Sequence, residues 1–580
     1  MRKLLTIAAI LLCLCSCNSQ LKNEIPDGKL YLYTLSATSP EDAYDEAEAV
    51  ACIQGIVNRN APVLYVLSST NTRPAYWLDK FYDGWMKSPQ KIQIETLDDL
   101  FEWAQDKIKG LVIWDENVPA SFNVATTIAG IEDAVVVTSE MAVKLQDRFK
   151  VIADLRGLFD GTVTGSAKND AYIWAKEEYL DKGKCSSHLM CLYEDPVRAR
   201  SVGDLSYVVT RDWAVCNRAF VYDLSPWGDE RPSDDMTQPI GCDLNTYKQI
   251  LSSKMKFSAD KEMTEVAGFF SFWKYSNQPG YPGKHGDVET EWENVFVISQ
   301  YNCYQNTVAS NCFNQSFHSK APSKAMTQGR PENYIKPENG KTYICLFMAD
   351  YDSTTPLYDF MPGNWEDPRR GERPLLWGIN PNLCETYPDI FEWLYSTRAE
   401  GDYFSSDASC AGYFNPNQLP EESLPLFVEH NKKFFEQWDM SLAPMVLDTD
   451  APTDAVKDAF TQFSPDGFAE IVIDFHNTGG KVPPTHIWKG MPVTELLNGV
   501  CNEGGNFTTV ENEAQRFASR LGAADPDSPQ FYLIRIVWQK PSTMFDVIDR
   551  VKTLRPDLDI ELLDGYNYFN CLKQANYPEL

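Results

Sequence analysis

The sequence predicts an α/β protein in which small α/β domains precede a carboxyl-terminal TIM-like barrel of seven or eight βα units. Short apolar runs alternate with helical or loop stretches through residues 241–580, the pattern of parallel strands joined by crossover helices. In the run Tyr343–Asp350, seven of eight residues are apolar, so this strand is expected to be buried on both faces. An open doubly wound sheet is the alternative topology.

The amino terminus, residues 1–16, has the features of a signal peptide. Arg2 and Lys3 precede an apolar core, Leu4–Leu14, that is too short to cross a bilayer as a helix. The following Leu-Cys-Ser-Cys resembles a bacterial lipobox, which predicts that Cys17 carries a lipid anchor. Asn18 favours an outer-membrane lipoprotein on the periplasmic or cell-surface face, and a plain secretory signal cut nearby is the alternative.

Three small α/β domains are expected next, over residues 28–98, 99–160 and 161–240. The first has a helix with one apolar stripe between two strands, and the second repeats this order. In the third, a helical segment is followed by a Pro/Asp-rich stretch that predicts a boundary near 240. The expected elements are strand 29–35, helix 41–57, strand 62–67, strand 110–114, helix 122–129, strand 134–137 and helix 170–184.

The carboxyl-terminal domain is expected over residues 241–580. Its predicted strands are short apolar runs separated by helical or loop stretches. They are 266–273, 343–349, 375–379, 402–406, 441–447, 469–475, 531–538 and 559–563.

The formal charge of −30 argues against nucleic-acid binding, because such a surface repels phosphate and no basic stripe interrupts it. A hydrophobic content of 43% is ample for large cores, so the chain is not a disordered one. No Cys/His spacing typical of zinc occurs. Most cysteines are expected to be free thiols, with Cys185–Cys191 and Cys303–Cys312 as pairs close enough to bridge.

Polar groups follow four of the predicted strands. Asp350 and Asp352 end one strand, Asp407 and Asp448 end two others, and His476 ends a fourth. Carboxyl ends of parallel strands form the active-site face of α/β barrels and open sheets, so these groups are candidate catalytic residues. Two carboxyls across a sugar suit glycoside hydrolysis, in which one protonates the leaving oxygen and the other attacks or activates water.

Aromatic residues near the same strand ends are candidates for stacking on sugar rings. Tyr351, Trp377 and Tyr413 are the ones assigned to substrate binding, with ordinary core packing as the alternative. No cofactor is expected, although Asp350 and Asp352 also suit a divalent cation such as Ca²⁺ or Mg²⁺.

The segment Ser405–Pro416, SSDASCAGYFNP, resembles the signature of the GxGYxYP family, described as putative glycoside hydrolases. Gly412, Tyr413 and Pro416 match the signature, while Cys410 replaces its first glycine and Asn415 its second tyrosine.

Further segments extend this resemblance over most of the chain. They are Ile53–Arg59, Met348–Ser353, Glu291 or Glu293 followed by Ser299, and Asn314–Ser316. The resemblance implies small amino-terminal domains and a barrel akin to the glycoside hydrolase and polysaccharide deacetylase superfamily. It also places Glu293 among the substrate-binding candidates. Within Met348–Ser353 the two aspartates match, whereas Tyr351 and Ser353 depart from the family pattern.

Together these features predict a lipid-anchored, carbohydrate-active protein, with a glycoside hydrolase as the leading interpretation. A glycan is the expected substrate or ligand, and the membrane is the expected partner of the lipid anchor. A non-catalytic glycan-binding lipoprotein with a degenerate barrel is the main alternative. A scaffold whose amino-terminal domains dock a partner at the membrane is the third.

Overall fold

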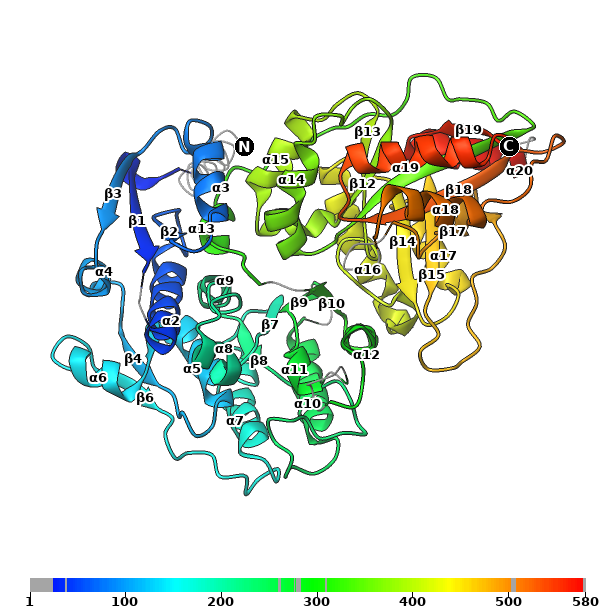
Figure 1. The fold of residues 1–580 in the computed structure, drawn as a ribbon. Helices are drawn as coiled ribbons and strands as arrows, with labels where there is room; N and C mark the ends of the chain where they lie inside the picture. The colour runs from blue at the N-terminus through cyan, green and yellow to red at the C-terminus, as the bar shows by residue number, and fades with distance from the viewer. Residues whose placement is uncertain are drawn as a thin grey trace, which may run out of the picture.

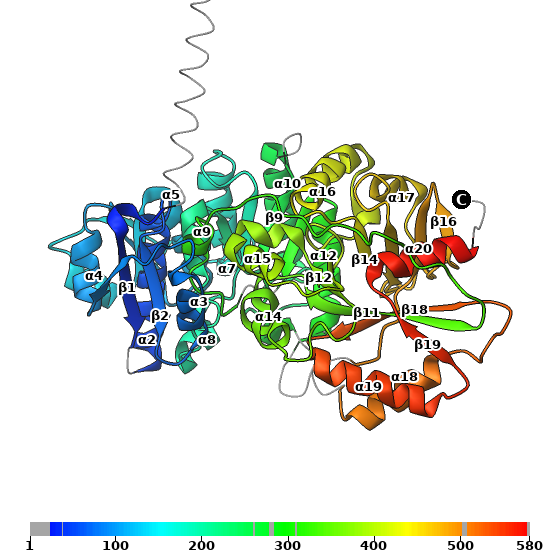
Figure 2. The same cartoon turned by 90° about the horizontal axis from the view of Figure 1, so that it is seen from above.

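The computed structural model describes residues 24–36, 39–258, 262–275, 277, 283–307, 310–501 and 507–576. Cys17 and its predicted lipid anchor lie outside these residues. Over the described residues the fold is mixed α/β, with strands arranged in five sheets. Three sheets lie in the amino-terminal half and two in the carboxyl-terminal half (Figure 1, Figure 2).

The first two sheets are small and parallel, as expected from the repeated strand–helix–strand order. The first sheet has the order β2-β1-β3 and the second β5-β4-β6. Their strands are β1 (Lys29–Leu35), β2 (Leu64–Ser68), β3 (Gln90–Ile94), β4 (Gly110–Ile113), β5 (Ala134–Val137) and β6 (Val151–Asp154). Their helices include α2 (Pro40–Val57), α3 (Arg73–Tyr82), α4 (Leu97–Ala104), α5 (Ala120–Glu132) and α6 (Ser139–Leu145).

Local capping explains where two of these helices begin. At α2, Ser39 accepts a hydrogen bond from the backbone N–H of Asp42, and Pro40 occupies the first helical position. At α4, Thr96 and Asp99 form a reciprocal capping box. Each cap satisfies backbone donors that have no partner inside the helix, so the helix start is set by the sequence itself.

The third sheet spans the boundary that was expected near residue 240. Its order is β10-β9-β7-β8, all parallel, with α10 (Cys242–Ser258) leading from the Pro/Asp-rich stretch into β9. The strands are β7 (Leu189–Leu192), β8 (Phe220–Tyr222), β9 (Thr264–Gly268) and β10 (Cys303–Thr307). The strand predicted at 266–273 is therefore β9 of this sheet and does not join the carboxyl-terminal strands.

A buried ion cluster explains why the Pro/Asp-rich stretch is not a linker. Asp234 lies within it and is nearly inaccessible, paired with both Lys168 and Lys274. Lys274 also pairs with Asp195 and Asp223, which follow β7 and β8. Buried charges need such partners, so the stretch folds into the domain.

Two further sheets hold the predicted carboxyl-terminal strands. The first has the order β13-β12-β11-β18, with β19 also paired to β11, and all its pairs are parallel. The second has the order β14-β15-β17-β16, in which only β16 and β17 pair antiparallel. The strands are β11 (Lys341–Tyr351), β12 (Leu375–Ile379), β13 (Asp402–Ser405), β14 (Leu442–Asp448), β15 (Gly467–Val472), β16 (His486–Trp488), β17 (Met491–Glu495), β18 (Gln530–Val537) and β19 (Asp559–Leu562).

Among the described strands no single closed sheet is present, so the predicted TIM barrel is not confirmed. The described strands make two open sheets whose edges meet at isolated bonds. Ser406 N donates to Leu442 O over 3.2 Å, and a lone parallel bridge joins Leu497 to Ile534. After Ser406 the backbone of Asp407 turns to the Asn380 side chain, which ends the pairing of β13.

Buried hydrogen bonds join the amino-terminal sheets to the carboxyl-terminal half. Asn314 accepts from Gln54 Nε2 and from Val66 N, each over 2.6 Å. Arg73 at the start of α3 binds both the carboxylate and the carbonyl oxygen of Asp359. Two of the family-like segments, Ile53–Arg59 and Asn314–Ser316, therefore meet in the core and hold the halves together.

The described cysteines, including both pairs considered for bridges, are free thiols. None of the described helices combines the length and apolarity that a membrane crossing requires.

Candidate active site at the ends of two sheets

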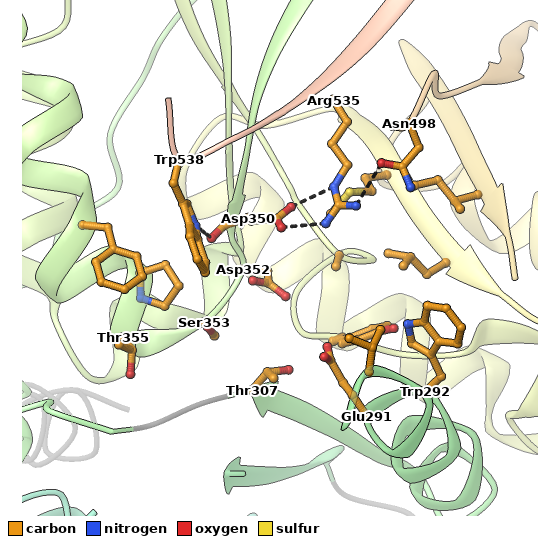
Figure 3. Close-up of a pocket in the computed structure, with 18 of the residues that line it drawn as sticks. Glu291, Trp292, Thr307, Asp350, Asp352, Ser353, Thr355, Asn498, Arg535 and Trp538 are labelled. Carbon is orange, nitrogen blue, oxygen red and sulfur yellow. Dashed lines mark hydrogen bonds and ion pairs between the residues drawn. The ribbon is translucent and has the colours of Figure 1, made fainter. Parts of the chain in front are cut away.

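A cavity of about 460 Å³ lies where the carboxyl ends of β10 and β11 face the helix α12 (Asp287–Ser299). Residues from segments far apart in the sequence line it (Figure 3). Its polar lining includes Glu291, Thr307, Asp350, Asp352, Ser353, Thr355, Asn498 and Arg535. A cavity of this size with a few converging polar groups is a candidate binding or catalytic site.

Asp350 is held by a two-point ion pair with Arg535. Arg535 Nε and Nη2 donate to Asp350 Oδ1 and Oδ2 over 2.9 and 2.6 Å. Trp538 Nε1 donates to the backbone oxygen of Asp350 over 2.6 Å, and Arg535 Nη1 binds Asn498. Asp350 has a φ of 68°, a left-handed conformation stabilised by these contacts. The fork geometry fixes both side chains at the cavity wall (Figure 3).

Among the described residues, Asp352 forms no ion pair, in contrast to Asp350. The left-handed backbone at Asp350 interrupts the alternation of the strand, so Asp350 reaches Arg535 while Asp352 projects into the cavity (Figure 3). Burial and the neighbouring Asp350 raise the pKa of Asp352 to about 7. The Arg535 guanidinium acts in the opposite direction. Asp352 is therefore placed to exchange a proton near neutral pH.

Glu291 supplies a second carboxyl from a different wall. It lies on α12, where Val288, Glu291 and Trp292 share one helix face and all line the cavity. Burial raises the pKa of Glu291 to about 8, and the charges of Asp352 and Asp350 add to the effect. The two carboxyls with raised pKa values, Glu291 and Asp352, thus project into one cavity (Figure 3).

Asp407 is fully buried and does not line the cavity, whereas the next residue, Ala408, does. Asp407 Oδ2 accepts from Tyr351 N over 3.1 Å, and its Oδ1 has no partner among the described residues. Burial, Asp352 and Asp350 all raise its pKa well above the usual range. A protonated carboxyl is the form that this environment favours.

Of the three aromatic residues assigned to sugar binding, the structure places only Tyr413 at the cavity. Tyr351 is buried with its hydroxyl bound to Asn364, and Trp377 is buried with its indole N–H on Asp402. Both belong to the core, because β11 and β12 are covered on both faces.

Trp292, Phe360 and Trp538 supply the other aromatic walls of the cavity.

The signature segment is tied to the third sheet through its backbone. Tyr413 and Gln305 exchange hydrogen bonds of 2.9 and 3.1 Å, which joins the signature to β10. Gly412 has a φ of 115°, and a Cβ there would lie 2.2 Å from the Tyr304 ring. Only glycine fits this position.

The departures from the signature fall mostly outside the cavity. Cys410 is buried, and Asn415 is buried with its N–H bound to Ser299 Oγ. Tyr351 is a core residue, so Ser353 is the one departure that lines the cavity.

Asp448, His476 and Glu293 do not line the cavity. Backbone N–H groups of Asn417 and Thr449 bind the two oxygens of Asp448, whose pKa burial raises to about 7. His476 Nε2 and Glu293 Oε2 lie 2.7 Å apart, so these two candidates pair with each other. The strand ends therefore converge less completely than the sequence suggested.

Arg535, Asn498 and Trp538 line the cavity but were not identified from the sequence. The sequence could have pointed to Arg535, because it is the single charged residue in the apolar strand 531–538. Nothing in the sequence pattern pointed to Asn498 or Trp538.

A cation site at Asp350 and Asp352 is not favoured by this geometry. Both oxygens of Asp350 already bind Arg535. Among the described residues, no group of three or more His, Cys, Asp or Glu is arranged to hold a metal ion.

Comparison with known families gives two matches. The GxGYxYP putative glycoside hydrolase C-terminal domain matches residues 340–570, and the second domain of the GxGYxYP amino-terminal region matches residues 108–183. No curated protein matches the chain.

Among solved structures, a putative hydrolase from Bacteroides thetaiotaomicron is similar with a TM-score of 0.71. The identity is 15%, over 95% of this chain and 96% of that chain, so the likeness concerns the fold alone. A family 4 carbohydrate esterase from Streptomyces lividans, in complex with acetate, reaches a TM-score of 0.22. It is 10% identical over 40% of this chain and 93% of that one, too distant to carry an argument.

Proposed function

Because this chain belongs to the GxGYxYP family of putative glycoside hydrolases, we propose that it hydrolyses a glycosidic bond in the cavity between α12 and β11. The observation that carries this proposal is the pair Glu291 and Asp352. Both carboxyls line one sugar-sized cavity, and both have pKa values raised into the range in which a group donates or accepts protons.

We assign the role of the acid to Glu291 and the second role to Asp352, which lies beside the Asp350–Arg535 pair. Glu291, with the higher pKa, keeps its proton and gives it to the leaving glycosidic oxygen as the bond to the anomeric carbon breaks. Asp352, ionised first, either attacks the anomeric carbon or takes a proton from the attacking water. Water supplies the oxygen of the new hydroxyl. In the covalent route that water breaks the bond to Asp352 and gives its proton to Glu291; in the direct route Asp352 releases the proton it took to solvent, and Glu291 regains one from solvent.

Arg535 and the aromatic walls position the sugar. The Asp350 fork holds the guanidinium at the wall, where its charge also limits the rise in the pKa of Asp352. Trp292, Tyr413 and Trp538 offer ring surfaces for the apolar faces of sugars.

We also propose that the two carboxyl-terminal sheets act as one TIM-like barrel. Support comes from the bonds at Ser406 and Leu497, which join the sheet edges on both sides. Hydrogen exchange tests this: the amides of Ser406 and Leu497 should exchange as slowly as those in β11. Fast exchange at both would leave two independent sheets.

For localisation, we propose a lipid anchor at Cys17 and an outer-membrane position. Its support is the lipobox-like sequence alone. Cys17→Ala should move the protein from the membrane fraction to the soluble fraction, with loss of palmitate labelling. Unchanged fractionation would refute the anchor.

Reducing-end release from a panel of neutral polysaccharides tests the hydrolase proposal. Asp352→Asn and Glu291→Gln should each lower kcat by at least about 100-fold, the scale of general acid–base catalysis. Asp450→Asn and Glu422→Gln, the same changes at exposed acids, serve as matched controls. Full activity in Asp352→Asn would remove that residue from the reaction, and saturable binding without turnover in the wild type would favour the glycan-binding alternative.

A further inference from the structure

A second hollow, of about 450 Å³, opens at the carboxyl ends of β1 and β2. Leu35 and Ser36 at the end of β1, the start of α2 from Ser39, the loop after β2 and the segment after α8 (Pro196–Val202) line it. In parallel α/β sheets this end of the strands is where ligands bind. Neither candidate catalytic carboxyl, Glu291 or Asp352, lies in this hollow.

The second hollow adjoins the catalytic cavity. Asn311 lines both, and its backbone N–H binds Ser206 O in the wall of the second hollow. A second link runs through Arg73: Asn71, in the lining of the second hollow, accepts from Arg73 N, and the Arg73 guanidinium binds Asp359. Asp359 lines the catalytic cavity, so Asn311 belongs to both linings and a chain of contacts through Arg73 joins them at a second point.

The lining of the second hollow suits an uncharged, hydroxyl-rich ligand. Its polar residues are mainly serine, threonine and asparagine, and its charged ones are Glu46 and Asp204. Among the described residues that line it there is no lysine or arginine, so they offer no cation to an anionic ligand such as a phosphate.

The lining of this hollow combines hydrogen-bonding groups that have no partner among the described residues with apolar side chains. Ser206 Oγ and Asn71 Nδ2 have no hydrogen-bond partner among the described residues, and both belong to the lining. The lining also includes Val202, which is 64% exposed, and Phe313, which is buried. Sugars present the matching combination of hydroxyl edges and apolar ring faces.

We propose that this hollow is a second sugar-binding subsite, and that the substrate is a neutral oligosaccharide or polysaccharide that extends from the catalytic cavity past Asn311 toward the amino-terminal sheet. The inference rests on the proposed glycosidase function and adds its substrate class. An enzyme built this way prefers long chains, because remote contacts with the chain contribute binding energy to the reaction.

The test uses disaccharides and hexasaccharides of the cello-, manno-, xylo-, malto- and chito- series with the full chain. Ser206→Trp fills the hollow without removing its backbone contact to Asn311, and Ser519→Trp on the exposed face of α18 (Val510–Arg520) is the matched control. Hydrolysis is followed by product release, and binding by calorimetry with Asp352→Asn.

The expected result is a kcat/KM at least tenfold higher for a hexasaccharide than for the corresponding disaccharide. Ser206→Trp should abolish that preference and leave disaccharide hydrolysis unchanged, while Ser519→Trp keeps both. Hydrolysis with no length preference, unaffected by Ser206→Trp, overturns the subsite and leaves the hydrolase intact. Hexasaccharide binding that is lost in Ser206→Trp, without turnover by the wild type, supports the subsite and overturns hydrolysis; no binding at all overturns both.

Discussion

The pH dependence of the reaction follows from the two cavity carboxyls. Asp352 must be ionised, so the rate should rise as pH passes its pKa of about 7, and Glu291 must be protonated, so the rate should fall above about 8. With these values the active protonation state reaches about 60% of the enzyme near pH 7.5. It falls about sevenfold at 1.5 pH units on either side, which gives a narrow bell-shaped profile.

The assay separates the two limbs with an aryl glycoside of the sugar that the enzyme releases. A 2,4-dinitrophenyl leaving group needs no proton, so kcat/KM measured from pH 5 to 10 should lose its alkaline limb and keep its acid limb. Glu291→Gln should be nearly as active as wild type on this substrate and severely impaired on the natural glycan. The reasoning fails if Glu291→Gln is equally slow on both substrates, or if the acid limb persists in Asp352→Asn.

Three further predictions concern groups around the cavity and in the sheets. Arg535→Met breaks the ion pair with Asp350. Because both side chains are about one-fifth exposed, the free energy of unfolding measured in urea should fall by roughly 2–3 kcal/mol. Since Arg535 lowers the pKa of Asp352, the acid limb of the pH profile should move to higher pH in this variant. Gly412→Ala should destabilise the protein strongly, because the backbone φ there is 115° and the new Cβ would clash with the Tyr304 ring. Gly479→Ala is the control: its φ is 86° but the space around it is open, so it should cost only about 1 kcal/mol. Equal losses of Tm in the two variants would contradict the steric argument. Glu470 is buried without hydrogen-bond partners among the described residues, and burial raises its pKa from 4.5 to about 8. Wild-type stability should therefore fall as pH rises from about 4.5 to about 8 and level off above that. Glu470→Gln should remove that loss, worth roughly 2–4 kcal/mol, and parallel stability curves for both proteins from pH 4 to pH 9 would contradict the argument.

Strand positions and the first acidic residues were readable from the sequence because they depend on local pattern. The apolar run that ends at Asp350 is buried as predicted, and both Asp350 and Asp352 line the cavity. The positions of these two aspartates need only the burial of one strand and the geometry of its end. Tyr413, which also lines the cavity, was named because of the signature that surrounds it.

Features that depend on contacts between distant segments could not be predicted from the sequence. Tyr351 and Trp377 sit beside strand ends in the sequence, but their rings turn into the core. The Pro/Asp-rich stretch before residue 240 has the composition of a linker, yet the buried pairs of Asp234 fold it into a domain. Arg535 looked like an exception in an apolar strand until the structure supplied its partner, Asp350.

The cavity is a joint product of two parts of the chain, which explains why no single motif reveals it. The family match to the carboxyl-terminal domain begins at residue 340 and contains Asp352, whereas Glu291 lies before it on α12. Two backbone contacts fix the parts in register: Asn415 binds Ser299 at the end of α12, and Tyr413 pairs with Gln305 on β10. Backbone contacts of the signature segment therefore hold the two acids in place relative to each other. For this site the backbone geometry matters more than matching each signature side chain, since Asn415 keeps its contact with Ser299 despite its departure from the pattern.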